Sequence, residues 1–568
     1  MRWKPRIDSG REIPAALRML LRLTPLALLG LGIEALYPDV RWLRRWLEGA
    51  YYGVVGLFAL QLSLDFLRAG SQTAFFRTRT LDMLLLLPLA LATDGLRIAV
   101  GFVALRQTLE ITRSLMPLRD ARRRLTALRF TPARVVALSF AATILAGTVL
   151  LMLPAATAER QGTALLDALF TATSAVCVTG LIVLDTPKHF STFGQVVLIG
   201  LIQVGGLGIM TFSTFLAIAL GRRMGMQGRV VMQDLLEEQN IETVKSTIVG
   251  ILKMTFTVEA IGALVLTWAW YTPGDGLQRA LLLGVFHSIS AFNNAGFALF
   301  SDSLMRYRGD LLINLTVTTL IIIGGLGFTV ISGLLEWRFW GKARVPRLSC
   351  HSRMVLTTTG ILLAGGTLMF FMAEYSKSMA DWSWTDLLLS SYFQAVTSRT
   401  AGFNTIDTAS LTDLSLFITI ILMFIGASPT GTGGGVKTTT LALLVLSVRA
   451  ILRKRDQVEV FYRTIPREMV HKALVIITFS FSLINLFTIA LLFTDEARFL
   501  ATMFEVVSAF GTVGLSMGLT PSLTAAGKVI IIIVMFIGRI GPLTMAVALG
   551  EQPDRARYAY PTERVMVG

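Results

Sequence analysis

Long apolar runs alternate with short polar segments through the chain from about residue 131. These runs reach or approach the ~20 residues that a helix needs to cross a bilayer. They lie at 134–153, 193–220, 247–270, 311–335, 355–373, 412–427, 473–493 and 526–549. Between the two runs of each pair is a shorter apolar segment, at 166–176, 281–291, 386–396 and 499–509. Each is expected to be a half-crossing helix whose C-terminal end, with its partial negative charge, favours a cation near the membrane centre.

A polar stretch rich in Ser, Thr and Asn follows each short segment and ends in a glycine with an aromatic residue ten positions before it. These glycines are Gly180, Gly296, Gly402 and Gly514, spaced 116, 106 and 112 residues apart (296−180, 402−296, 514−402). A Ser lies six positions before three of them, and Val396 is the exception. A polar loop at this period predicts four copies of one unit around a central axis.

The predicted fold is an all-α polytopic membrane protein with four repeats of helix, pore loop and helix around a central pore. The expected repeats are 131–220, 246–336, 353–448 and 468–550. Residues 1–130 form a helical extension with three or four further membrane segments, and 551–568 form a cytoplasmic tail. The stretch from Phe75 to Arg113 faintly resembles part of a voltage sensor. Its arginines lack the regular spacing of a sensing helix, which favours a packing or assembly role.

Composition supports the membrane assignment and orients the protein. Apolar residues make up 54% of the chain and charged residues 15%. The net charge of +16 is concentrated in alternate linkers, within 222–245, 338–353 and 449–472. Basic linkers are retained in the cytoplasm, so the glycine-tipped loops are expected to open outward in a multi-pass protein of the cell membrane. The lipid bilayer and cytoplasmic partners account for the charge, and nucleic acid is not expected as a partner.

The glycine-tipped tripeptides suit an alkali cation. Backbone carbonyls can replace the water around such an ion where glycine relieves steric limits. The tripeptides contain no carboxylate, which disfavours a calcium-type ring of Asp or Glu, and the last one matches the start of the potassium-channel filter. The candidate filter residues are Val178, Thr179, Gly180, Asn294, Ala295, Gly296, Thr400, Ala401, Gly402, Thr512, Val513 and Gly514.

The third inner helix contains a long interruption at 426–438, with five glycines, a proline and three threonines. Such a segment cannot continue a helix, so it is expected to form a loop inside the membrane, below the tripeptides. It is not a phosphate-binding loop, because Val436 rather than glycine precedes Lys437. The GGLG motifs at 205–208 and 324–327 are expected to stay within helices and pack closely through their small residues.

Six motifs together resemble the Trk/Ktr/HKT superfamily of potassium-uptake proteins, and most closely its bacterial Ktr B subunits. They are AVCVTGL (175–181), FNNAGF (292–297), SRTAGFNTID (398–407), GASPTGTGGGVKTTT (426–440), FGTVGL (510–515) and GRIGP (538–542). The resemblance covers residues 131–550. It implies a single asymmetric pore, K⁺ as the transported ion, a homodimer, and a cytoplasmic nucleotide-binding ring of regulatory subunits (KtrA/TrkA-like, RCK-type). Na⁺ is a candidate modulating ion.

The resemblance also assigns residue roles. The implied gate consists of Thr430, Gly431, Thr432, Gly433, Gly434, Gly435, Lys437 and Arg539. Some relatives have Ser at the first filter glycine and favour sodium, so Gly180 implies potassium selectivity. Arg539 could instead be a counter-charge for Glu505 or bind a carbonyl of the bundle. Arg399 is expected to brace the filter from behind.

The function expected from the sequence is channel-like uptake of potassium without enzymatic chemistry. A secondary transporter with broken helices would have inverted repeats, whereas all four units here run in the same direction. A membrane-embedded enzyme would need convergent titratable groups, and the four histidines are widely scattered. A pore gated by voltage through residues 1–116 is the remaining alternative.

Overall fold

The computed structural model describes residues 41–68, 100, 103, 132–208, 244–272, 274, 276–339 and 348–541. The chain forms two compact parts, residues 1–129 and 130–568. In the first part, helix α3 (Arg41–Arg68) has Phe58 and Leu62 packed against Val103. The other predicted N-terminal membrane segments and the tail at 551–568 lie outside the described residues.

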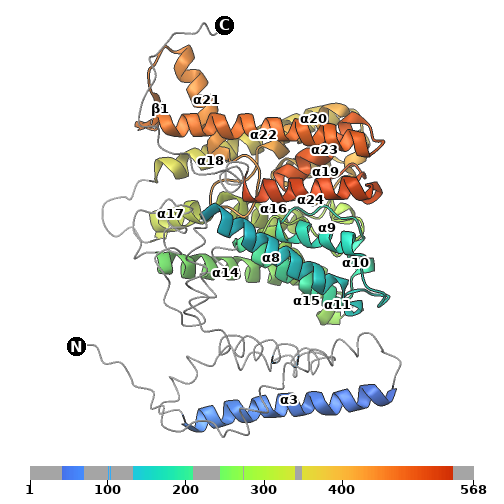
Figure 1. Ribbon diagram of the computed structural model, residues 1–568. Coiled ribbons are helices and arrows are strands. Elements are labelled where there is room, and N and C mark those ends of the chain that lie inside the picture. The colour runs from blue at the N-terminus through green and yellow to red at the C-terminus, as the bar shows by residue number, and fades with distance from the viewer. Residues whose placement is uncertain are drawn as a thin grey trace, which may run out of the picture. The chain divides into compact units, whose positions relative to one another are not determined.

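The second part is built from helices (Figure 1), and each of its four predicted repeats is called a unit below. The first predicted repeat contains α8 (Pro132–Met152), α9 (Leu165–Val176), α10 (Thr186–His189) and α11 (Thr192–Leu207). The second contains α14 (Val244–Trp270), α15 (Gly276–Phe292), α16 (Leu311–Leu326) and α17 (Phe328–Phe339). The third contains α18 (Cys350–Glu374), α19 (Trp384–Thr397), α20 (Asp413–Phe424) and α21 (Thr438–Leu452). The fourth contains α22 (Arg467–Thr494), α23 (Phe499–Gly511) and α24 (Ala525–Ile540).

The third and fourth predicted repeats are joined by a small antiparallel hairpin. Its strands are β1 (Val458–Val460) and β2 (Arg463–Ile465), with Val458 opposite Ile465.

Among the described residues, three helices are long and apolar enough to cross a membrane on their own: the Ile248–Trp270 part of α14, α18 and α22. The pair α16 and α17 would also qualify, but it is bent by 101° at Gly327. The remaining apolar helices are shorter, including α9 and α23, which correspond to predicted half-crossing segments. Three of the four outer helices are therefore long enough to cross a bilayer, whereas the described parts of the short helices α9 and α23 are not.

The four inner helices α11, α16, α20 and α24 begin in the same way. Ser191, Asp310, Thr412 and Thr524 are their N-caps, and each side chain accepts a hydrogen bond from a backbone N–H in the first turn. The N–H to oxygen distances are 3.0–3.3 Å. A hydroxyl or carboxylate at this position satisfies an N–H group that the helix leaves free. The local sequence thus fixes where each inner helix starts.

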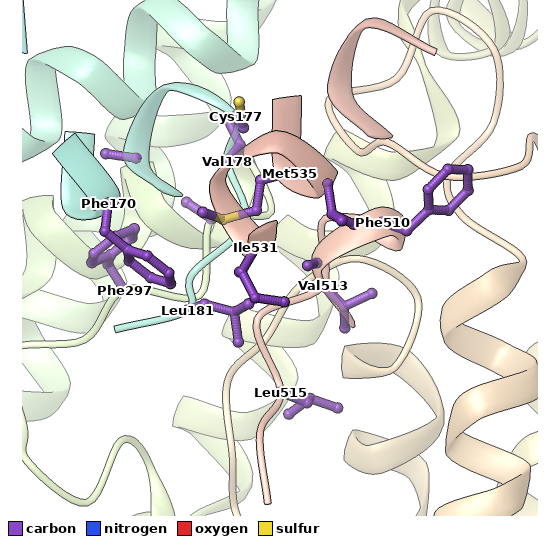
Figure 2. Close-up of a cluster of buried hydrophobic side chains, with 14 of the residues drawn as sticks. Phe170, Cys177, Val178, Leu181, Phe297, Phe510, Val513, Leu515, Ile531 and Met535 are labelled. Carbon is purple, nitrogen blue, oxygen red and sulfur yellow. The ribbon is translucent and has the colours of Figure 1, made fainter. Parts of the chain in front are cut away.

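The helix contacts form a closed cycle. Each short helix packs against its own outer helix, in the pairs α8–α9, α14–α15, α18–α19 and α22–α23. Each also packs against an inner helix of the preceding unit, in the pairs α11–α15, α16–α19, α20–α23 and α24–α9. The last pair joins the end of the sequence to its beginning. Figure 2 shows this junction, where Phe170 and Val178 lie in one apolar cluster with Val513, Ile531 and Met535.

The expectation of continuous helices through the GGLG motifs was wrong. Helix α11 ends at Leu207 and α16 at Leu326, and the glycines that follow, Gly208 and Gly327, have φ of 73° and 88°. With ψ of 139° and 152°, both glycines adopt a backbone conformation that is open to glycine and cannot continue a helix, and after Gly327 the chain turns into α17. Close packing was predicted correctly, because a Cβ on Gly205 or Gly324 would collide with a carbonyl oxygen of a neighbouring half-crossing helix.

Candidate functional site

The four glycine-tipped tripeptides lie together in a ring. A Cβ placed on Gly296 would come within 3.1 Å of the Gly402 Cα and 2.7 Å of the Ala401 carbonyl oxygen. The corresponding Cβ distances to the next glycine Cα are 3.2 Å from Gly180 to Gly296, 3.2 Å from Gly402 to Gly514 and 3.0 Å from Gly514 to Gly180. In every case the nearest atom is the carbonyl oxygen of the residue before the neighbouring glycine. A Cβ at any of these four positions would therefore force the neighbouring segment to shift.

The tripeptides share an unusual backbone conformation. The four glycines have φ of 89°, 70°, 79° and 93° in chain order. Two residues earlier, Val178, Asn294, Thr400 and Thr512 also have positive φ, between 51° and 77°. Three of these four are β-branched, a class for which left-handed φ is a genuine outlier. Strain of this kind costs about 1–3 kcal/mol per residue and concentrates at functional sites.

Hydroxyl groups hold the segments from behind. The Gly180 N–H donates to Ser174 Oγ at 3.0 Å, and the Gly514 N–H donates to Ser508 Oγ at 3.1 Å. In the second unit, Ser290 Oγ donates to the Phe297 carbonyl at 2.8 Å. In the third, Thr397 Oγ1 makes the equivalent bond to the Phe403 carbonyl at 2.8 Å.

The sequence pattern did not identify Thr397. Its hydroxyl lies one position after Val396, the apparent exception, and it supplies the support that a Ser gives in the other units. The sequence did contain a signal for this role, because a hydroxyl residue, Thr397, directly follows Val396.

The third inner helix is interrupted by the 425–437 loop, which lies between α20 and α21. Its two ends are joined, since the Gly426 N–H donates to the Val436 carbonyl at 2.8 Å. Its tip contacts two tripeptides: the Gly434 N–H donates to Thr512 Oγ1 at 2.9 Å, and a Cβ on Gly433 would collide with Thr400 Oγ1. The structure thus places the loop directly against the third and fourth tripeptides.

The loop is also fastened to the second inner helix. The N–H groups of Ser428 and Thr432 donate to the carbonyls of Gly325 and Gly324, at 3.0 and 3.1 Å. The Thr430 and Thr329 hydroxyls are hydrogen-bonded at 3.0 Å, which connects the loop to α17. Hydrogen bonds therefore join the loop to the fourth tripeptide on one side and to α16 and α17 on the other.

Two positively charged side chains bind carbonyls of the loop: Arg539 of α24 and Lys437, the last residue of the loop. The Arg539 guanidinium donates from one terminal nitrogen to the Thr432 carbonyl and from the other to the Gly205 carbonyl. Lys437 Nζ donates to the Gly433 carbonyl at 2.7 Å. Arg539 thus binds carbonyls of the bundle, while Glu505 accepts hydrogen bonds from Ser516 at 2.7 Å and from Thr520.

A cluster of polar side chains, which the sequence did not predict to lie together, joins the first and second units. The Asn293 amide nitrogen donates to Glu259 Oε1 at 2.9 Å and to Gln203 Oε1 at 3.1 Å. Gln203 Nε2 in turn donates to Glu259 Oε2 at 3.2 Å. Through these bonds Glu259 makes a polar contact between helices. The side chains come from α11, α14 and the residue after α15.

An ion pair connects the ends of the cycle on the side where the inner helices begin. Lys528 Nζ on α24 lies 2.6 Å from Asp167 Oδ1 on α9, and both side chains are largely buried. Near the second tripeptide, in the loop before α16, the Arg306 guanidinium lies 2.6 Å from Asp302 and holds the pKa of that carboxyl below its usual value. The Asp302 pair is exposed and local, whereas the Lys528 pair joins the last unit to the first.

Residues 111–557 match the family model TrkH, described as a cation transport protein. The chain belongs to the TrkH family of cation transport proteins. The match covers more than half of the sequence and includes every tripeptide, the 425–437 loop and Arg539.

Several TrkH-family relatives are similar over most of the chain. The Ktr system potassium uptake protein B of Bacillus subtilis is 44% identical over 446 residues, 78% of this chain and 97% of the relative. The protein of the same name from Vibrio alginolyticus is 41% identical, covering 77% and 94%. The potassium/sodium uptake protein NtpJ of Enterococcus hirae is 36% identical, covering 78% and 98%.

A solved TrkH structure has the same fold. The crystal structure of the potassium transporter TrkH from Vibrio parahaemolyticus aligns with a TM-score of 0.59 at 17% identity, covering 93% of this chain and 98% of that one. At this identity the similarity concerns the fold alone. This member of the TrkH family is accordingly a multi-pass helical membrane protein that transports cations.

Proposed function

We propose that this protein conducts potassium into the cell through a filter formed by the four tripeptides. The observation that carries the proposal is the ring of four glycines, each against the carbonyl of the next segment. Within each tripeptide the first and third residues have positive φ. Alternation of the sign of φ turns successive carbonyls toward the same side of a chain, where they can replace the water around an ion.

The relatives support potassium as the ion. Two of them are named as potassium uptake proteins, and a third as a potassium/sodium uptake protein. A filter of neutral carbonyls without a carboxylate suits a monovalent cation, and the narrow ring requires the ion to shed its water. Sodium is proposed as a modulating ion.

We propose that the 425–437 loop is the gate. It touches the third and fourth tripeptides through Gly433 and Gly434, so it lies where it can obstruct an ion leaving the filter. Arg539 and Lys437 bind carbonyls of this loop, and their positive charges oppose a cation in the same place. Movement of the loop would remove both the steric and the electrostatic barrier.

The proposed assembly is a homodimer with a cytoplasmic ring of nucleotide-binding regulatory subunits. The Ktr relatives are named as one lettered protein of a system, which supports a second component. The hairpin β1–β2 follows a basic segment in which Arg453, Lys454 and Arg455 are exposed. Such a segment offers a cytoplasmic docking surface for an acidic partner.

Purified protein in liposomes tests the proposal through Rb⁺ and Na⁺ uptake, with and without the cytosolic partner. Deletion of residues 431–435 should raise Rb⁺ uptake without changing the Rb⁺/Na⁺ ratio, because the deletion removes the obstruction and leaves the ring. Unchanged uptake after this deletion would reject the gate. Equal uptake of Rb⁺ and Na⁺ by the unaltered protein would reject the potassium filter.

A further inference from the structure

Arg399 is the only charged residue among the four that stand three positions before a filter glycine. The corresponding residues are Cys177, Asn293 and Gly511. Arg399 lies two residues after the end of α19 and is 9% exposed. An arginine at this depth is costly and is retained when it has a role.

The Arg399 side chain borders a small cavity where α16, α18 and the end of α19 meet. The cavity has a volume of about 20 Å³, the space open to the centre of a water molecule. One water needs about 10–15 Å³ by this measure. Arg399 and Thr359 are the polar side chains that line it; the other lining residues are Ile321, Ile322, Gly325, Leu326, Leu363, Val396 and Ala427.

Both polar groups lack a partner within the described part of the chain. Arg399 Nε and Thr359 Oγ1 are buried, and neither makes a hydrogen bond to another described residue. Thr359 differs in this from two neighbouring threonines of α18: Thr357 and Thr367 donate to the carbonyls of Arg353 and Leu363, each at 2.8 Å. A buried polar group without a partner loses free energy, so native proteins normally supply one.

A single water fits the chemistry of this cavity. Its oxygen accepts a hydrogen bond from the Arg399 Nε–H, and it donates one of its own hydrogens to Thr359 Oγ1. We propose that Arg399 and Thr359 bind an ordered water at the junction of the second and third units, and that the hydrated Arg399 positions the third filter segment. The second part of this inference depends on the proposed function of the tripeptides.

The cavity lies next to both the third tripeptide and the 425–437 loop. Thr400, the strained first residue of the third tripeptide with φ of 77°, directly follows Arg399. Ala427, near the start of the 425–437 loop, lines the same cavity. A water bound in this cavity restrains Arg399, immediately before the third tripeptide, and lies beside Ala427, near the start of the proposed gate.

The surroundings of the third tripeptide support a hydrated environment. Of the thirteen buried side-chain atoms without a partner among the described residues, seven belong to the third unit. They come from Thr359, Ser390, Ser391, Gln394, Arg399, Thr405 and Thr408. The described part of the fourth unit has none. Among the described residues, the third unit, which also holds the 425–437 loop, is therefore the one with the most buried polar atoms available to bind water.

The test compares Thr359→Val with Thr367→Val, a matched control on the same helix. A high-resolution cryo-EM map of the full-length protein should show density between Arg399 Nε and Thr359 Oγ1, and Thr359→Val should remove it. In liposomes, Thr359→Val should lower the Rb⁺/Na⁺ uptake ratio about fivefold, equivalent to about 1 kcal/mol. Thr367→Val should leave the ratio unchanged. Thr359→Ser keeps the hydroxyl and should retain both the density and the ratio.

Three results would overturn the proposal. One is an empty cavity, or a map in which Arg399 Nε bonds directly to protein. A second is an unchanged uptake ratio in Thr359→Val, which would remove the positioning role. The third is a density lost when gluconate replaces chloride, which would identify an anion. If the unaltered protein takes up no Rb⁺, the proposed function fails, while the map still decides whether water is bound.

Discussion

Gly180→Ser is the substitution that most directly tests the filter. The residue has φ of 89°, and a Cβ there would collide with the Ala295 carbonyl oxygen and lie 3.2 Å from the Gly296 Cα. The hydrogen bond from the N–H of residue 180 to Ser174 Oγ opposes movement of the serine away from this oxygen. The carbonyl of the second segment must therefore shift, and with it one of the oxygens proposed to bind the ion.

The magnitude follows from the strain that the substitution introduces. Overpacking of the serine Cβ against the Ala295 carbonyl oxygen costs about 1–3 kcal/mol, which the ring can relieve only by moving that carbonyl. If that free energy is lost from the preference for K⁺ over Na⁺, the Rb⁺/Na⁺ ratio falls about 5- to 140-fold, at about 1.4 kcal/mol per tenfold change. Sodium uptake should rise in absolute terms, since the deformed ring no longer demands an ion of one size.

Gly518→Ser is the matched control for this experiment. Gly518 has φ of 88°, but a Cβ there would meet nothing within 4 Å. Both variants carry the same backbone penalty, and only Gly180→Ser disturbs a neighbouring segment. Uptake of ²²Na⁺ and ⁸⁶Rb⁺ into liposomes measures the ratio. The reasoning is refuted if Gly180→Ser retains the parental ratio, or if Gly518→Ser lowers the ratio equally.

Three further predictions follow from the hydrogen bonds and ion pair. Arg539→Gln should raise Rb⁺ uptake several-fold, because it removes the positive charge beside the loop; reduced uptake would contradict the gate assignment. Thr512→Val should also increase uptake by loosening the tip of the loop, since the Gly434 N–H loses its acceptor; an unchanged rate would show that this contact does not hold the gate. Asp167→Asn should lower stability by about 1–2 kcal/mol, seen as a reduced melting temperature in detergent, because Lys528 loses its buried partner; a double variant with Lys528→Met should recover part of the loss.

Sequence alone located two of the short helices to within a residue or two at each end. The half-crossing segment predicted at 499–509 is α23, Phe499–Gly511, and the one predicted at 166–176 is α9, Leu165–Val176. These predictions succeeded because apolar length, polar stretch and terminal glycine are all local features of the chain. The hydroxyl of Thr397 was missed because its role depends on where Phe403 returns to meet it.

The tertiary structure decided how the inner helices end and what their polar residues contact. A GGLG motif has one composition whether the helix continues or breaks, and only the position of the 425–437 loop against Gly324 and Gly327 shows why α16 stops there. Likewise, the sequence left Arg539 two possible partners, Glu505 or a carbonyl, and the fold selected carbonyls of Thr432 and Gly205.

The sequence by itself determined a helical membrane protein with four polar, glycine-ended loops, because hydrophobic length and glycine position are written into short stretches of chain. The closed order of the ring and the contact of the loop with two of its segments came from the tertiary structure. These features depend on residues more than 70 positions apart in the chain, such as Gly434 and Thr512, which only folding brings within a hydrogen bond of each other.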